Sequence, residues 1–311
     1  MSITLSVVIP TYNRVFYLTK VLKGLEQQSL DKSCFEIIIV DNKSTDNTKE
    51  VVLGYSTSIE NLIYIYEPKQ GLNYARNTGL CQARGEYIAY LDDDAVPYEH
   101  WAKKIIEVFA SVKPQPGVVG GPTVPVWVGE KPTWLIPKFE PAISMINYGG
   151  ESRFLQGREF LVGANMAFLK TALVSIGGFI DGLDRIGDKL LSGGDTAAIE
   201  SVKKLNLGVY YHPDIAVDHY VSANRLTHKW FIKRYYWGGY SEALMWYKLS
   251  KPNYRLRLKK IGFYLYGFIR NPAHLAYPFY TPANPQKFWF KCIVHARIGY
   301  LYSLFNHIAK N

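Results

Sequence analysis

The chain of 311 residues contains only three cysteines, Cys34, Cys81 and Cys292. Their odd number and wide spacing argue against a disulfide framework and against the closely paired cysteines of a zinc site. Free thiols indicate a reducing compartment. We therefore expect the protein to be on the cytoplasmic side of a cell membrane.

Long apolar runs are also missing. The longest candidate, at 261–269, is closed by Arg270 and is far shorter than the roughly 18 residues of a membrane-spanning helix. No basic segment precedes the first apolar run, which is short and ends at Pro10, so we expect no signal peptide.

Glycine-rich phosphate loops are absent as well. The chain has no Gly-x-x-x-x-Gly-Lys-Ser/Thr motif, and no Gly-x-Gly-x-x-Gly motif follows the first apolar run. If the protein binds a nucleotide, we expect it to do so with side chains and a metal ion.

An acidic triplet is the most informative feature that is present. Asp92, Asp93 and Asp94 follow an apolar, alternating run at 86–91, which is typical of a buried strand. Adjacent carboxylates repel one another, and a hard divalent cation removes the repulsion while still holding an anion such as a diphosphate. A solvated acidic turn is the alternative that the triplet alone leaves open.

Apolar runs and helical patterns alternate along the N-terminal part. This alternation predicts a parallel sheet with right-handed crossovers. Parallel topology places the loops after the strands at one edge, where open α/β sheets bind ligands. The expected strands are 6–10, 36–40, 61–66 and 86–91, and the polar loops are 11–14, 41–46 and 92–94.

Four segments of this part resemble the motifs of the family 2 glycosyltransferases of GT-A fold, in the family's order. They are 6–14, 40–48, 71–77 and 91–94, and weaker similarity continues to about residue 220. The resemblance implies a metal-dependent, inverting transfer of a sugar from a nucleotide-diphosphate donor, with Mn²⁺ or Mg²⁺ as the metal.

The resemblance also implies roles for individual residues. Those implied to bind the nucleotide are Thr11, Tyr12, Arg14, Asp41, Arg76 and Asp93, and those implied to bind the metal are Asp92 and Asp94. Tyr12 offers a flat face to a base, Asp41 can accept an imide N–H, and Arg76 can fork onto phosphate oxygens. Taken alone, Arg14 is equally well explained as a surface charge and Tyr12 as a packing residue.

The resemblance continues into the expected acceptor half. Segments 163–168 and 177–181 are similar to family segments, and the first of them would lie beside the donor sugar. Relatives usually carry two acids ahead of the next helix, where this chain has Gly194 and Asp195. The resemblance implies that Asp195 is the catalytic base. Capping of that helix is the alternative, and Asp188 is a second candidate for the base.

The last expected strand is 215–217, and a histidine, His219, follows it. In the family such a residue often reaches the metal or the diphosphate, so the resemblance implies that His219 is a metal ligand. A neutral imidazole is a suitable third ligand beside two carboxylates. A structural role is the alternative, and His212 is a weaker candidate.

The charge of the chain is unevenly distributed. Residues 221–311 contain fifteen Lys and Arg and one acid, Glu242, giving +14, whereas the whole chain carries +10 and residues 1–220 therefore −4. Basic residues mixed with aromatic ones suit helices in the headgroup region of an anionic membrane. Packing against the rest of the protein is an open alternative. No nucleic-acid-binding motif is present, so we expect no nucleic acid as partner.

These observations predict an α/β protein of GT-A type, with a mostly parallel Rossmann-like sheet flanked by helices. We expect a catalytic domain at 1–220, divided into a nucleotide-binding half at 1–97 and an acceptor half at 98–220, and a basic helical extension at 221–311. The predicted activity is transfer of a sugar, as by a hexosyltransferase, to a polysaccharide or lipid-linked acceptor. A sugar nucleotidyltransferase and a catalytically dead binding scaffold are the alternatives, the latter because Gly194 replaces an acid.

Overall fold

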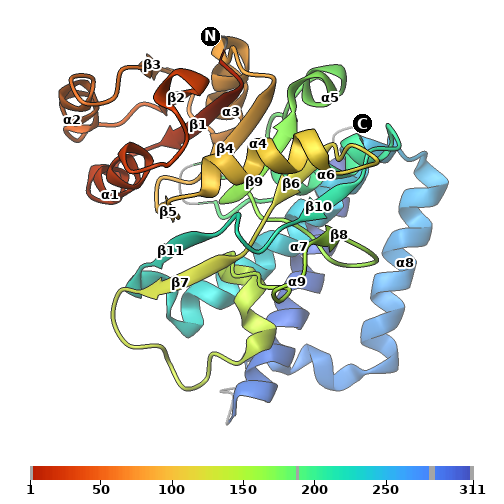
Figure 1. Ribbon diagram of the computed structural model, residues 1–311. Coiled ribbons are helices and arrows are strands. Elements are labelled where there is room, and N and C mark those ends of the chain that lie inside the picture. The colour runs from red at the N-terminus through yellow and green to blue at the C-terminus, as the bar shows by residue number, and fades with distance from the viewer. Residues whose placement is uncertain (1–2, 187–188, 280–283, 309–311) are drawn as a thin grey trace. The chain divides into compact units, whose positions relative to one another are not determined.

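The computed structural model describes residues 3–186, 189–279 and 284–308 (Figure 1). Contacts within the chain define two compact units. The first comprises Met1–Val126, Ser144–Gly182 and Gly194–Val221, and the second comprises Trp127–Ile143, Leu183–Gly193 and Ser222–Asn311. The division into functional domains at residue 220 stays a prediction, because contacts alone do not show what each unit does.

An eight-stranded sheet forms the centre of the first unit, in the order β3-β2-β1-β4-β9-β6-β10-β8. The strands are β1 (Leu5–Thr11), β2 (Phe35–Asp41), β3 (Leu62–Tyr66), β4 (Tyr87–Leu91), β6 (Val118–Gly120), β8 (Arg153–Phe154), β9 (Asn165–Leu169) and β10 (Val209–Tyr211). Strands β3, β2, β1 and β4 are parallel neighbours, and so are β6 and β10, whereas β9 is antiparallel to β4 and β6 and β8 is antiparallel to β10. The predicted α/β fold with a mostly parallel sheet is confirmed.

The central strands are covered on both faces. Every residue of β1, β2 and β4 is buried, which explains why these strands are nearly continuous apolar runs in the sequence. Two polar side chains interrupt the runs and are buried as a pair, since the Ser6 hydroxyl donates to Glu36 at 2.6 Å. The Arg84 side chain also donates to Glu36, at 2.7 Å, so this buried carboxylate is compensated.

Helices in the first unit connect the strands. They are α1 (Val15–Glu26), α2 (Thr48–Tyr55), α3 (Leu72–Gln82), α4 (Trp101–Ser111), α5 (Lys170–Ser175) and α6 (Gly194–Lys203), with a short 3₁₀ turn η1 (Lys32–Cys34). Helix α1 buries Leu18, Val21, Leu22 and Leu25, spaced as one face of a helix requires. The three cysteines of the chain are free.

A second, three-stranded sheet has the order β5-β11-β7 and consists of β5 (Ala95–Pro97), β11 (Val217–Val221) and β7 (Thr123–Trp127). Strand β11 is antiparallel to β5, with His219 opposite Ala95. The sequence predicted a strand that ended before His219. The strand instead includes this residue, because Val217, His219 and Val221 alternate as the buried side of β11.

The second unit is mostly helical. Its long helices are α7 (His228–Ser250), α8 (Tyr254–Arg270) and α9 (Pro285–Ile308), and its 3₁₀ turns are η2 (Pro137–Ile143), η3 (Ala223–Arg225), η4 (Pro272–Leu275) and η5 (Tyr277–Phe279). Thr227 caps α7 by accepting from Trp230 N, and Asn253 caps α8 by accepting from Leu256 N. Helices α7 and α9 approach closely where Gly239 faces the backbone of Ala296, so a side chain at Gly239 would force them apart.

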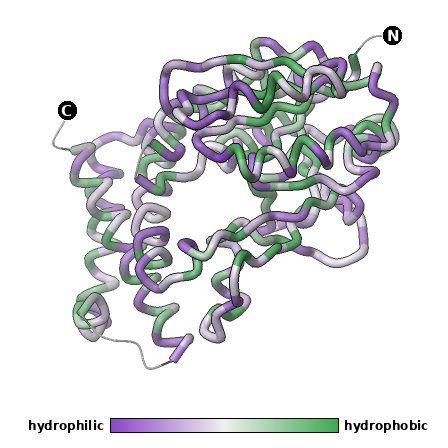
Figure 2. The backbone as a smooth tube through the Cα atoms, turned by 90° about the vertical axis from the view of Figure 1, so that its left-hand side faces the viewer, coloured by the Kyte–Doolittle hydropathy of each residue, from purple (hydrophilic) through white to green (hydrophobic). Residues whose placement is uncertain are grey.

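Helix α8 buries little of its surface. Only Ile261 and Phe268 are buried on it, within a cluster that includes Val294, Tyr300 and Leu304 of α9. Hydrophobic and hydrophilic residues alternate along the helices near the C-terminus (Figure 2). Across the residues that the structure describes, no helix has both the length and the apolar character needed to cross a membrane.

Candidate active site

The loops after the parallel strands lie together at one edge of the sheet, as predicted. Thr11 and Asp41 are register partners at the ends of β1 and β2. The Thr11 hydroxyl donates to Asp93 Oδ2 at 2.9 Å, which joins the loop after β1 to the loop after β4. The backbone N–H of Asn13 donates to Ser44 Oγ at 2.9 Å, which joins the loops after β1 and β2.

Arg14 contacts the acidic triplet. Its NH1 donates to Asp93 Oδ1 at 3.1 Å and to Asp94 Oδ2 at 2.5 Å. Burial raises the pKa of Asp93 to about 6, with a further rise from Asp94, while Arg14 opposes the rise. Burial alone would lower the pKa of Arg14, but the two carboxylates outweigh it and raise that pKa above its ordinary value. The three groups therefore form one compensated cluster.

His219 approaches the same cluster from the small sheet. Its Nε2 lies 3.4 Å from Asp94 Oδ1, and both side chains are buried. Its other ring nitrogen, Nδ1, is buried and has no hydrogen-bond partner among the residues that the structure describes. The backbone N–H of Tyr220 donates to the Asp94 carbonyl at 2.9 Å, which fixes β11 against the triplet.

These side chains fit a hard divalent cation in their chemistry. A carboxylate and an imidazole 3.4 Å apart can both reach one ion, since each ligand atom lies about 2.0–2.2 Å from such a metal. Asp92 is more exposed and lies 3.9 Å from Arg76 NH2. Within the described part of the chain no three His, Cys, Asp or Glu side chains are grouped closely enough to hold an ion by themselves. Waters and substrate phosphates commonly complete such a ligand set.

Asp41 holds its own loop in shape. Its Oδ1 accepts from Ser44 N at 2.8 Å, and its Oδ2 accepts from the Tyr64 hydroxyl at 2.8 Å. Burial and the adjacent carboxylate raise the pKa of Tyr64, so this hydroxyl stays a donor. Each carboxylate oxygen has a second lone pair, which leaves Asp41 able to accept from a ligand. Tyr12, next to these loops, is 43% exposed.

Asn42 is a residue whose role the sequence did not reveal. Its amide nitrogen donates to the carbonyls of Glu67 and Lys69 at 3.2 and 2.8 Å, and its Oδ1 accepts from Gly71 N at 2.7 Å. These bonds tie the loop after β3 to the loop after β2, just before α3 begins. The sequence feature that could have revealed this role is an Asn directly after an expected strand, where its amide can bond to neighbouring backbone groups.

Arg76 and Asp195 meet at Gly163. Arg76 is buried on α3, and Asp195 Oδ2 accepts from the Gly163 backbone N–H at 3.0 Å. A Cβ atom on Gly163 would collide with Arg76 NH2 and lie 3.1 Å from Asp195 Oδ2. A side chain at this position would therefore push the end of the Arg76 side chain away from its place beside Asp195. The structure brings Asp195, in the first turn of α6, towards the predicted diphosphate-binding residue.

Asp195 makes no ordinary helix cap. An N-cap side chain accepts from a backbone N–H two or three residues further on. Asp195 Oδ1 accepts instead from the adjacent Thr196 N, at 2.8 Å, and Oδ2 accepts from Gly163, on a distant segment. The bond from Thr196 N satisfies a first-turn N–H of α6, as the capping alternative requires, and the bond from Gly163 N is additional to it.

Two weaker candidates, Asp188 and His212, also came from the sequence. Asp188 falls outside the described residues. His212 accepts from Asp214 N at 3.2 Å through Nδ1, and burial lowers its pKa. Among the residues that the structure describes, His212 has no contact with the triplet.

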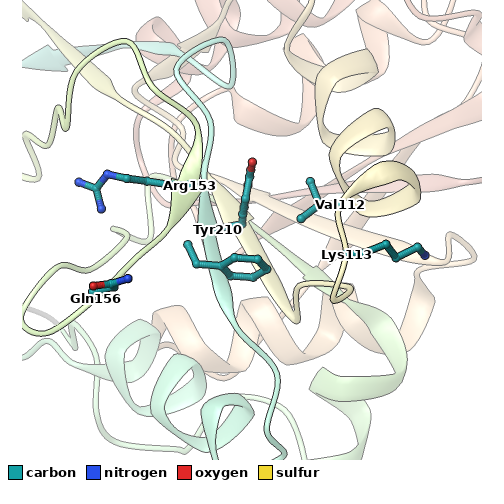
Figure 3. A pocket seen from close by; sticks show the side chains of 6 residues that line it. Val112, Lys113, Arg153, Gln156 and Tyr210 are labelled. Carbon is teal, nitrogen blue, oxygen red and sulfur yellow. The ribbon is translucent and has the colours of Figure 1, made fainter.

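An open hollow of about 660 Å³ lies away from these residues, between the end of α4 and strands β8 and β10. Figure 3 shows Tyr210 at its centre, with Arg153 and Gln156 on one side and Val112 and Lys113 on the other. Both terminal nitrogens of Arg153 are bonded to Glu159, at 2.7 and 2.6 Å. The hollow contains none of the predicted site residues.

A Rossmann-like sheet with an acidic triplet after β4, beside which lie buried Arg76 of α3 and buried His219 of β11, defines a GT-A glycosyltransferase. The family model for glycosyl transferase family 2 matches residues 6–175, more than half of the chain. The chain belongs to this family, and the resemblance described above is confirmed.

Named relatives agree with this assignment. "Glycosyltransferase AglE" of Haloferax volcanii is 41% identical over 100 residues, a stretch that covers only 32% of this chain and 33% of that protein. "Glucosyl-dolichyl phosphate glucuronosyltransferase" of the same organism is 24% identical over 243 residues, covering 77% of this chain and 76% of that protein.

Among solved structures, a mannosyltransferase from Pyrobaculum calidifontis in complex with GDP-Man and Mn²⁺ aligns with a TM-score of 0.57. The alignment covers 100% of this chain and 75% of that chain at 18% identity. At this identity the likeness establishes the fold.

Proposed function

We propose that the protein transfers a sugar from a nucleotide-diphosphate donor to a hydroxyl of a glycan or lipid-linked acceptor. The observation that carries the proposal is the placement of Asp195. Its carboxylate is held at Gly163 beside Arg76, and Arg76 in turn lies 3.9 Å from Asp92 of the triplet. A base, a diphosphate-binding cation and metal-binding acids are thus linked by a continuous set of contacts.

In this proposal Asp195 is the general base. It takes the proton of the acceptor hydroxyl while the acceptor oxygen forms a bond to the anomeric carbon. The bond between that carbon and the diphosphate oxygen breaks on the opposite face, and the electron pair leaves with the diphosphate. Attack from the opposite face inverts the anomeric configuration. The Gly163 N–H and Thr196 N–H hold the carboxylate in one orientation for this transfer.

Arg76 stabilises the negative charge that develops on the departing diphosphate. Its buried position favours this role, because an ionic interaction is stronger where water is excluded. Asp92, Asp94 and His219 would hold a divalent metal, which when bound neutralises the diphosphate and assists its departure. The mannosyltransferase structure that contains Mn²⁺ supports this choice of metal.

The nucleoside would bind along the ends of β1 and β2. Thr11 and Asp41 are register neighbours there, and Tyr12 beside them is exposed enough to stack on a base. Asp93 and Arg14 would be the remaining residues of this nucleoside-binding surface. Because Arg14 lies on Asp93 and Asp94, it must share Asp94 with a metal or move when the donor binds.

The relatives support an acceptor class. The Haloferax glucuronosyltransferase is named for a dolichyl phosphate-linked acceptor, so we propose a lipid-linked or growing glycan acceptor here. The same proposal places the protein at the cytoplasmic face of a membrane, with 221–311 in contact with its anionic lipids. The charge of +14 in this segment supports the contact.

The experiment that tests the activity begins with a panel of nucleoside diphosphates and their sugars. Purified protein is screened with Mn²⁺ for thermal stabilisation, since a ligand that binds the folded state raises its stability. Hydrolysis or transfer is then measured for the sugar nucleotide that stabilises most. Binding without any turnover would favour the dead scaffold, and release of pyrophosphate from a sugar phosphate would favour a nucleotidyltransferase.

Asp94→Ala tests the metal site. We expect this variant to lose transfer and Mn²⁺ binding, because Asp94 Oδ1 lies 3.4 Å from His219 Nε2 in the proposed ligand set. Manganese binding is followed by electron paramagnetic resonance, and circular dichroism checks the fold. Full activity of the variant in the presence of a chelator would contradict the proposal.

A further inference from the structure

Helices α7, α8 and α9 line a cavity of about 500 Å³ inside the second unit. The cavity lies outside the residues that the family model matches, which end at 175. Aromatic side chains form much of its wall. Tyr264 and Tyr300 stack with ring centroids 4.2 Å apart and planes at 17°, and Phe263 lines the same cavity.

Two arginines, Arg270 of α8 and Arg297 of α9, also line this cavity. Arg297 donates to His274 Nδ1 at 3.1 Å, and burial, together with Arg297, lowers the pKa of that imidazole so that it remains a neutral acceptor. Over the described ranges, neither arginine forms an ion pair with a carboxylate. Two guanidinium groups outside any such ion pair, beside apolar walls, suit an anion that carries an apolar tail.

One acid is present in the cavity. Glu242 is the only Asp or Glu of residues 221–311. Burial raises the pKa of its carboxyl, which Lys260 opposes. The same burial disfavours the charged form of this carboxyl.

The outer surface of α8 is apolar and basic together. Phe263 and Ile269 are 72% and 74% exposed. Transfer of such apolar side chains out of water is favourable, so their exposure leaves stabilisation unused. Exposed Arg255 and Lys259 lie among them on the same helix, and α8 contains no acid. This combination is typical of helices that lie in the headgroup region of an anionic bilayer.

We propose that α8 lies on an anionic membrane and that Arg270 and Arg297 bind the phosphate of a lipid headgroup in the cavity between α7, α8 and α9. The inference rests on the membrane contact included in the proposed function, and it names the helix, the cavity and the ligand. The acyl chains of the lipid face the apolar side chains of α8. Charge complementarity selects this occupant, because the segment offers fifteen cations against one acid.

Flotation of the full chain with lipid vesicles tests the site. Phosphatidylcholine vesicles with and without phosphatidylglycerol are compared for the wild type and for Arg270→Gln/Arg297→Gln. The matched control is Lys229→Gln/Lys233→Gln, which removes the same charge from exposed positions of α7. We expect the arginine variant to lose binding to anionic vesicles by on the order of tenfold, and the control by about twofold, because a built site holds its ligand more tightly than diffuse charge does.

Equal losses in the two variants would overturn the cavity site, and equal binding to neutral and anionic vesicles would overturn the membrane surface. Glycerol phosphate is the soluble probe. If it stabilises the wild type against heat and the arginine variant keeps full vesicle binding, the ligand is a soluble phosphate and the proposal is wrong.

A third variant, Phe263→Ser/Ile269→Ser, tests the apolar contact. These side chains are exposed, so the fold should survive, which circular dichroism verifies. We expect vesicle binding at high salt to fall several-fold, since apolar insertion persists when charges are screened. Unchanged binding would overturn insertion of α8. Turnover of the sugar nucleotide without vesicles is measured for the wild type and for every variant. Absence of turnover in the wild type would contradict the transferase proposal and leave the result of the vesicle assay standing.

Discussion

The acidic edge of the sheet and the outer surface of α8 use charge in opposite ways. At the sheet edge, Asp93 and Asp94 are buried, and Arg14 and Thr11 contact them directly. On α8, Arg255 and Lys259 are exposed among exposed apolar side chains. At the sheet edge, a few charged groups are hydrogen-bonded to one another. Helix α8 instead carries several basic side chains and contains no Asp or Glu.

This difference teaches what each region can recognise. Buried, bonded groups are preorganised, so they can hold one ligand in one geometry and act on it. Exposed cations on a helix attract an extended anionic surface and tolerate many orientations. The comparison therefore predicts sharp effects of single changes at the sheet edge and graded effects on α8.

Asp195→Asn should have the largest effect. The amide keeps the shape of the side chain but cannot take the acceptor proton, so we expect turnover to fall by a factor on the order of 10² or more. Donor affinity, measured by calorimetry, should stay within a few-fold of the wild type. Asp214→Asn, at an exposed position, is the matched control. Normal turnover of Asp195→Asn would move the role of base elsewhere, with Asp188 next to test.

Gly163→Ala should have the next largest effect. The new methyl group would collide with the mobile end of Arg76 and contact Asp195, so the side chains can shift while the backbone stays in place. We expect turnover to fall about tenfold, on the scale of a misplaced catalytic group, with a small change in melting temperature.

Gly150→Ala is the control for this change, since its Cβ would meet no atom within 4 Å. Equal turnover of the two alanine variants would show that the contact at Gly163 does not position the catalytic groups.

Ligand binding at the two regions should respond differently to ionic strength. Vesicle binding through exposed cations should weaken several-fold between roughly 0.05 and roughly 0.5 M salt, because the screening length shortens over this range. Nucleotide binding in Mn²⁺ should weaken less, since its side chains are largely buried. Flotation and calorimetry at matched salt concentrations measure both. A steeper loss for the nucleotide than for the vesicle would contradict the contrast.

The smallest expected effect is a pH dependence of stability. Burial raises the pKa of Asp93 from 3.8 to about 6, so the folded protein binds this proton more tightly than the unfolded chain does. The resulting stabilisation is present at low pH and is lost as the pH rises from about 4 to about 6.

Asp93→Asn removes this titration. We expect the free energy of unfolding in chelator, compared between pH 5 and pH 7, to fall by about 1 kcal/mol more in the wild type than in the variant. Urea denaturation at both pH values measures it. Parallel changes in the two proteins would show that Asp93 does not titrate in this range.

Much of the fold could be predicted because its signals are local. The apolar runs at β1, β2 and β4 are buried on both faces, so their composition alone marks them as central strands. The boundaries of β11 could not be predicted in this way. Its extension through His219 depends on pairing with β5, which is distant in the sequence.

The candidate site shows the same division. That the triplet meets the loop after β1 follows from parallel topology and could be predicted. The partners of Asp41 could not, because Tyr64 reaches it from the neighbouring strand β3 through side-chain geometry. The same holds for Asn42, whose amide bonds to a loop that the sequence pattern does not place.

The sequence by itself determined which strands are central, that their polar loops share one edge, and that the C-terminal segment is basic, since composition and chain order suffice for each. Only the tertiary structure decided that His219 reaches Asp94, that Gly163 lets Arg76 approach Asp195, and that Arg14 lies on the triplet. It also decided which side of α8 is exposed. These outcomes depend on contacts between segments far apart in the chain, and such contacts form only when the whole fold brings the segments together.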